Sequence, residues 1–136
     1  MLFRSVILGD FNENPDEYEL VGGAYPTALR SSADGYGPWL SLYSDNPEAL
    51  PENSFFCPWE DTGGYSYVYE GRRERIDSIL MSPGAAAGPS FKYHSFSAEP
   101  PAFLLNAAGE PIRWSATAQD GYSDHLPITL RLRPLP

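Results

Sequence analysis

The chain has little cysteine, little positive charge and no long apolar run, and each shortage excludes a class of protein. Its single cysteine, Cys57, cannot form a disulfide within the chain. No apolar stretch approaches the ~20 residues of a membrane-spanning helix, so we expect no membrane span. Nine basic residues stand against 18 acidic ones, a net charge of −9. Because proteins that bind nucleic acid phosphates usually carry a basic face, this charge disfavours duplex DNA as a partner.

The residues that are abundant favour a single β-rich domain. A length of 136 residues is typical of one domain, and 42% hydrophobic residues are enough to build a core. Fourteen prolines and twelve glycines favour short strands and long ordered loops over a helical bundle.

The first half of the chain predicts strands with one short helix. The apolar run Val6–Leu8 is typical of a buried strand. A helix is predicted over about residues 15–21, because acidic residues favour its first turn and Gly22 follows it. Between residues 31 and 56, only residues 39–43 show a regular pattern.

The second half predicts hairpins. Residues 65–69 alternate large and small side chains, and a turn at Glu70–Gly71 precedes residues 76–81, which predicts that these two segments form a β-hairpin. Further strands are predicted at 91–96 and 126–133, with a hairpin-like pair at 104–105 and 112–114.

Three short polar clusters lie directly beside predicted strands. Gly9–Asn12 follows the first strand, Arg75–Asp77 opens the strand that continues to Met81, and Ser123–His125 precedes the last strand. In α/β enzymes, polar residues at the junctions of strands and loops form the functional site at the rim of the sheet. The clusters supply carboxylates, an amide and an imidazole, which suit phosphate-ester hydrolysis.

Asp10 and Asn12 provide groups for the attacking water and the phosphate. The Asp10 carboxylate can accept a proton from the water or hold it in line with the phosphorus. If strand geometry persists, Asn12 points to the same side and its amide can donate to a phosphoryl oxygen. The alternative is that both residues form an Asx-type turn at the end of a strand.

Asp124 and His125 are adjacent, and adjacent side chains on extended backbone face opposite ways. We therefore expect His125 to face the phosphate and Asp124 to face a divalent cation such as Mg²⁺, which binds few carboxylates and keeps several waters. The other ring nitrogen of His125 needs an orienting partner, and Asp77 is the candidate. His94, which has no acidic neighbour in sequence, is interpreted as structural.

These three clusters, in this order, resemble the C-terminal part of the endonuclease/exonuclease/phosphatase superfamily, whose members are deoxyribonuclease-I-like. The resemblance spans Gly9 to His125. It implies an α/β fold, β-rich with few helices, that makes up half of a four-layer α/β/β/α sandwich. It also implies a role for each candidate residue: Asp10 orients or activates water, Asn12 contacts the phosphate and leaving group, Asp77 partners His125, Asp124 lies on the metal side, and His125 binds the phosphate.

The chain also departs from that superfamily. Complete members are about twice as long, and their first half carries an early Asn and a Glu that binds the principal metal, Mg²⁺ or Mn²⁺. We expect residues 1–136 to be the C-terminal portion of such a domain, without the N-terminal half. Half a sandwich leaves an apolar sheet face exposed, so we expect the chain to form a homodimer or to bind a complementary half.

Three functions remain open from the sequence. The first is a metal-dependent phosphoesterase, with a lipid phosphodiester, an inositol phosphate, a nucleotide or a nucleic acid as substrate. The second is a non-catalytic fragment or subunit that binds a complementary half or another protein. The third is an unrelated β-rich binding module in which the three clusters coincide by chance.

Overall fold

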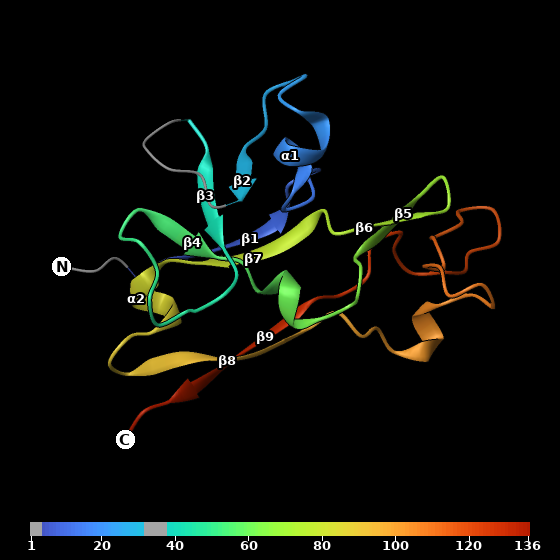
Figure 1. Cartoon of the computed structure of the whole chain (residues 1–136). Coiled ribbons are helices and arrows are strands. Elements are labelled where there is room, and N and C mark those ends of the chain that lie inside the picture. Colours follow the sequence, from blue (N-terminus) through green and yellow to red (C-terminus); the bar gives the residue numbers. More distant parts are fainter. Residues whose placement is uncertain (1–3, 32–37) are drawn as a thin grey trace.

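The computed structural model describes residues 4–31 and 38–136, and it is β-rich with few helices (Figure 1). Five strands form one curled mixed sheet. In their order across the sheet they are β1 (Val6–Asp10), β7 (Asp77–Met81), β4 (Ser54–Phe56), β3 (Leu40–Tyr43) and β2 (Leu29–Ser31). β1 and β7 are antiparallel, as are β7 and β4, whereas β4, β3 and β2 run parallel.

The remaining strands form two hairpins. β5 (Tyr67–Tyr69) pairs with β6 (Arg72–Glu74) across the turn at Glu70–Gly71. β8 (Phe91–Ser97) pairs with β9 (Thr129–Pro134), with an irregularity between Tyr93 and Ser95. The helical pieces are short: α1 (Glu17–Val21), α2 (Pro83–Ala86), and the 3-10 turns η1 (Pro58–Asp61) and η2 (Ala102–Leu104).

The main hydrophobic core lies where the β8–β9 ribbon meets the five-stranded sheet. Leu29, Leu42 and Leu80 are buried in it, together with Trp59 and Phe96. The Trp59 and Phe96 rings meet edge to face, with centroids 5.0 Å apart. This packing joins η1 to β8, and η1 also contacts β7.

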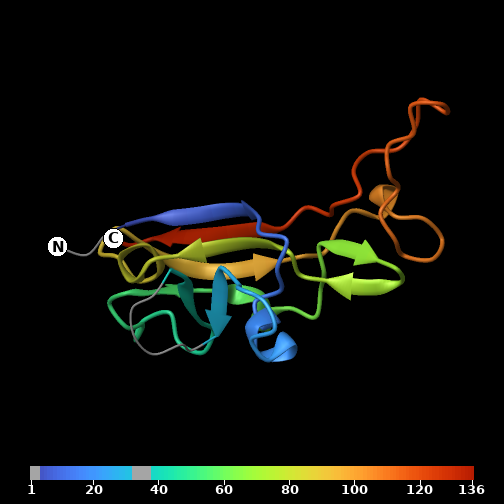
Figure 2. The same ribbon diagram turned by 90° about the horizontal axis from the view of Figure 1, so that it is seen from above.

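Between β8 and β9 the chain makes a long excursion, over residues 98–128, that extends away from the sheet (Figure 2). A ladder of backbone bonds holds it: Ile112 N donates to Leu104 O at 2.9 Å, and Tyr122 N donates to Ile112 O at 2.8 Å. Near its end the excursion meets the segment before β5, where Leu126 N–H donates to Ser66 O at 2.7 Å.

The structure confirms the predicted strands near residues 6–8, 39–43 and 91–96 and places the helix at Glu17–Val21, but it corrects the predicted hairpin. Residues 67–69 pair with residues 72–74, not with 76–81. The segment 77–81 joins β1 in the main sheet, because its alternation of buried side chains needs cover that a two-stranded ribbon does not provide. The last strand begins at Thr129, three residues later than predicted.

Candidate functional site

Three of the candidate residues meet at one end of the β1–β7 pair. Asp10 and Asp77 are cross-strand partners in the antiparallel register, so their side chains leave the same face of the sheet. His125 comes from the segment that precedes β9. Its Nδ1 lies 2.8 Å from the Asp77 carboxylate, and its Nε2 lies 4.0 Å from the Asp10 carboxylate. A carboxylate only accepts, so the ring donates Nδ1–H to Asp77 and turns Nε2 toward Asp10.

Asp77 is held by bonds to its backbone from two buried side chains. Its N–H donates to Ser66 Oγ at 3.1 Å, and its carbonyl accepts from Trp59 Nε1 at 3.0 Å. Ser66 and Trp59 are almost completely buried. The side chain of Asp77 itself is about one-fifth exposed, so its carboxylate reaches His125 at the edge of the core rather than within it.

His125 is positioned by the segment that opens the β5–β6 hairpin. It forms an antiparallel bridge with Tyr67, and its ring lies on the Tyr67 ring at a centroid distance of 4.8 Å. Its backbone N–H donates to Ser123 Oγ at 3.0 Å. Ser66 thus links the two segments that carry the pair, because it bonds the backbone of Asp77 and of Leu126, the residue after His125.

Asn12 does not continue the strand, which corrects the expectation that it shares a side with Asp10. β1 ends at Asp10, and Asn12 has a φ of 53°, in the left-handed region that Asn tolerates better than most residues. Its N–H donates to Asp10 Oδ1 at 2.8 Å, which is the Asx-type turn that the sequence left as an alternative. The turn holds one Asp10 oxygen in place, and Asn12 still lines the same cleft as His125.

Asp124 is half-buried and makes no hydrogen bond or ion pair with any described residue. It can contribute one oxygen ligand to a cation. Within residues 4–31 and 38–136, however, no three His, Cys, Asp or Glu side chains gather closely enough to hold a metal ion. The expected role of Asp124 as a metal ligand therefore stays a prediction, because no cluster of ligands surrounds it among the described residues.

An open cleft of about 730 Å³ adjoins the candidate catalytic residues. His125 and Asn12 lie on it, and most of its lining comes from α1 and from the β5–β6 hairpin. The volume lies in the range of pockets that hold small organic ligands. A substrate larger than a bare phosphate therefore has room beside these residues.

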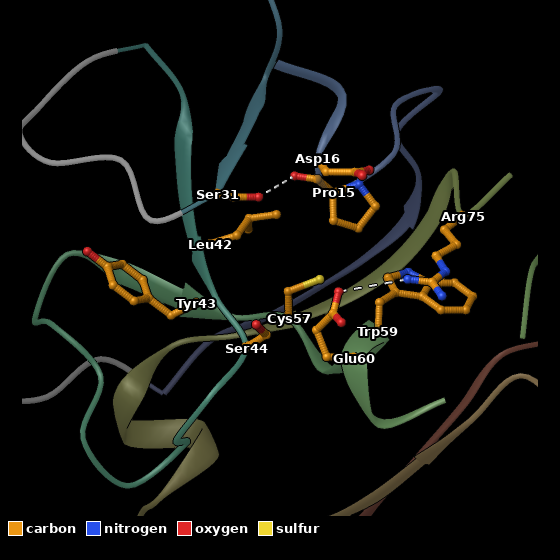
Figure 3. A pocket seen from close by; sticks show the side chains of 10 residues that line it. All are labelled: Pro15, Asp16, Ser31, Leu42, Tyr43, Ser44, Cys57, Trp59, Glu60 and Arg75. Carbon is orange, nitrogen blue, oxygen red and sulfur yellow. Dashed lines mark hydrogen bonds and ion pairs between the residues drawn. The ribbon is translucent and has the colours of Figure 1, made fainter. Parts of the chain in front are cut away.

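A second cavity, of about 70 Å³, lies next to Cys57, Trp59 and Arg75 (Figure 3). Its volume suits water rather than an organic ligand. Burial raises the pKa of the Cys57 thiol to about 11, so the thiol is protonated and not nucleophilic at neutral pH. Cys57 is a core residue, and this cavity is not the reaction site.

Three arginines lie within residues 72–75, a locally basic stretch of the sequence. Arg72 Nε lies 3.7 Å from Glu74, and Arg75 lies 3.8 Å from Glu60. The guanidinium group of Arg73 lies over the Tyr65 ring, 4.6 Å from its centroid. Each of these cations already has a partner in the structure.

Sequence reasoning missed Ser66 and Trp59, which hold Asp77, and Glu17 and Tyr25, which line the cleft. Ser66 carries no chemical signature, and its position between two tyrosines indicates only a strand. Glu17 looks like an ordinary acidic residue in the first turn of a helix. Only the tertiary contacts distinguish these residues from others of the same type.

No family model, curated protein or solved structure matched this chain in the comparisons made. None of the helices in the described residues is long and apolar enough to cross a membrane.

Proposed function

We propose that this chain carries the catalytic residues of a metal-dependent phosphate-ester hydrolase, a phosphodiesterase, phosphatase or nuclease. The observation that supports this most directly is the placement of His125 between two carboxylates. The Asp77 carboxylate is hydrogen-bonded to Nδ1, and Nε2 lies 4.0 Å from the Asp10 carboxylate. A histidine with a purely structural role would need only the bond to Asp77. Here the second nitrogen faces a carboxylate that is too distant for a hydrogen bond, and an open cleft lies beside it.

The chain's own residues supply three of the functions that hydrolysis needs. The Asp10 carboxylate holds or deprotonates the attacking water, whose oxygen bonds to phosphorus as the ester P–O bond breaks. Protonated His125 donates Nε2–H to a phosphoryl oxygen while Asp77 keeps Nδ1–H in place. The Asn12 amide contacts the phosphate or the leaving oxygen, which takes up a proton from solvent.

Mg²⁺ or Mn²⁺ would neutralise charge on the phosphoryl oxygens when bound, and Asp124 is the residue that would contribute to holding it. The remaining ligands would be water and groups from outside the described residues. We propose that these come from a second copy of the chain or from a complementary half, and the latter fits the resemblance to half of an α/β/β/α sandwich in the deoxyribonuclease-I-like superfamily.

The first test is hydrolysis of bis-p-nitrophenyl phosphate with Mg²⁺ or Mn²⁺ by the wild type, His125→Ala and His94→Ala. His94 is the only other histidine and is exposed on β8, which makes it the matched control. We expect a metal-dependent rate that falls at least about 100-fold in His125→Ala, a typical loss for a group acting in the reaction. His94→Ala should retain the wild-type rate, and a chelator should abolish it.

Equal rates in the two variants would contradict the proposed role of His125. An inactive wild type would favour the second candidate function, a non-catalytic fragment or subunit that binds a complementary half or another protein. Exposed apolar side chains on β1 support this candidate, because Leu8 is 71% exposed and Val6 is 43% exposed.

A further inference from the structure

The cleft beside His125 differs in charge from a site built for phosphate alone. Its charged lining consists of two carboxylates, Glu17 and Glu74, and one guanidinium, Arg72, in addition to His125. The Arg72 side chain is 71% exposed and lies next to Glu74, whereas the Glu74 side chain is only 19% exposed. Away from the phosphate position at His125, a ligand inside the cleft therefore meets two carboxylates and one guanidinium.

The two carboxylates accept hydrogen bonds from the same side chain, Asn14. The Asn14 side-chain amide donates to Glu17 Oε2 at 3.1 Å and to Glu74 Oε2 at 2.6 Å, and its own oxygen accepts from Arg75 N at 2.7 Å. Tyr25 donates its hydroxyl to the other oxygen of Glu17. This bond is the main reason that the pKa of Glu17 is lowered, so Glu17 is ionised at neutral pH. Each carboxylate still has lone pairs for a ligand.

Aromatic rings make up much of the remaining polar lining. Tyr67 and Tyr69 lie on β5, and Tyr25 lies beyond α1. Tyr25 and Tyr69 are about half exposed, so they are open to a ligand. Aromatic faces attract cations through their quadrupole, and ionised carboxylates beside them add to that attraction.

We propose that this cleft binds the alcohol portion of the phosphate ester and prefers one that carries a positively charged nitrogen. The proposal rests on the proposed function, because it places the phosphoryl group at His125 and Asn12 and the rest of the substrate in the cleft. Glu17 and Glu74 determine the specificity. They attract an ammonium group and disfavour a second anionic group, such as another phosphate.

Three phosphate monoesters that differ only at the far end of the alcohol test the preference. They are 2-aminoethyl phosphate, propyl phosphate and 2-carboxyethyl phosphate, with an ammonium, methyl and carboxylate group respectively. Binding to the full chain is measured by NMR titration, which needs no turnover. We expect the ammonium ester to bind about fivefold more tightly than the propyl ester, and the carboxylate ester to bind most weakly.

Variants assign the preference to the two carboxylates. Glu17→Gln combined with Glu74→Gln should reduce the ratio between the ammonium and propyl esters to about one. Glu19→Gln, an exposed acidic residue of α1 that does not line the cleft, should leave the ratio unchanged. Arg72→Gln removes the opposing cation from an exposed position and should raise the ratio, which tests the proposal even where the double variant fails to fold.

His125→Ala separates this proposal from the proposed function. Equal binding of the three esters, lowered equally by His125→Ala, would retain the phosphate site and overturn the cleft preference. Affinities for all three esters that His125→Ala leaves unchanged, with the ammonium ester still bound most tightly, would support the cleft as a cation subsite and contradict the phosphate site. Failure of all three esters to bind the wild type would overturn both.

Discussion

At the scale of single residues, the bond between His125 and Asp77 determines what the candidate site can do. The imidazole has two nitrogens, and the 2.8 Å contact with Asp77 fixes which of them carries the proton in the neutral ring. The free nitrogen then faces Asp10 and the cleft. Asp77 itself is immobilised through its backbone by Ser66 and Trp59, so its side chain is free for this one bond.

Replacing Asp77 with asparagine should change the tautomer of His125 before it changes the fold. With only two histidines in the chain, long-range proton–nitrogen NMR spectra distinguish them. We expect neutral His125 to carry its proton on Nδ1 in the wild type and to be a mixture of tautomers in Asp77→Asn. Where the wild type hydrolyses the ester, the rate should fall about 10- to 100-fold. The exposed Asp45→Asn is the control, and an unchanged His125 spectrum in Asp77→Asn would contradict the positioning role.

At the scale of elements, the excursion between β8 and β9 delivers His125 to the site. Its backbone turns back at Gly121, which has a φ of 99° and lies against the carbonyl of Arg113. A Cβ added there would lie 2.2 Å from Arg113 O, so this ladder closes only around a residue without a side chain. Four residues later the chain reaches His125.

Gly121→Ala should therefore loosen the excursion much more than Gly109→Ala does. Gly109 also has a positive φ, 79°, but a Cβ there meets nothing closer than 3.8 Å. We expect about 1 kcal/mol of local destabilisation in Gly109→Ala, from the backbone conformation alone, and at least about twice that in Gly121→Ala. Hydrogen exchange of the Tyr122 amide, which bonds Ile112 O, measures the difference. Equal exchange rates in the two variants would show that the close approach is not maintained in solution.

At the scale of the whole molecule, the chain exposes more surface than its mass predicts. Its accessible surface is 8505 Å², whereas a compact monomer of 15.0 kDa exposes about 7000 Å². Part of the exposed surface is apolar: Val6, Phe91 and Leu132 line one shallow groove, and Leu8 lies further along β1. β1 is also an edge strand of the sheet, so it can pair with another strand.

We therefore expect self-association through β1, and Leu8→Lys should weaken it. Sedimentation velocity should show a concentration-dependent dimer in the wild type and mostly monomer in the variant, because the substitution places a charge on the buried side of the interface. Leu20→Lys is the matched control, since Leu20 on α1 is equally exposed at 70%. A wild type that stays monomeric at all concentrations would leave a complementary half as the remaining candidate for this surface.

The sequence by itself determined the chemical candidates and the local elements nearest to them. The apolar run before Asp10 and the alternation in residues 91–96 predicted strands. The strand at β1 is confirmed, but its expected burial is wrong, because most of its side chains are exposed. Asp10, Asn12, Asp77, Asp124 and His125 were identifiable because few residue types can move protons or bind phosphate. The sequence did not decide whether Asn12 continues the strand or forms an Asx-type turn, because the local residues suit both conformations.

Only the tertiary structure decided which strands pair and what surrounds the candidate residues. Residues 77–81 could close a hairpin or enter the main sheet, and burial against β1 and the Trp59 core selected the sheet. That pairing placed Asp77 opposite Asp10, and the bridge to Tyr67 brought His125 to both. Glu17 and Glu74, 57 positions apart in the chain, became neighbours through Asn14. Such contacts depend on the free energy of burying the whole core, which no local segment of the sequence contains.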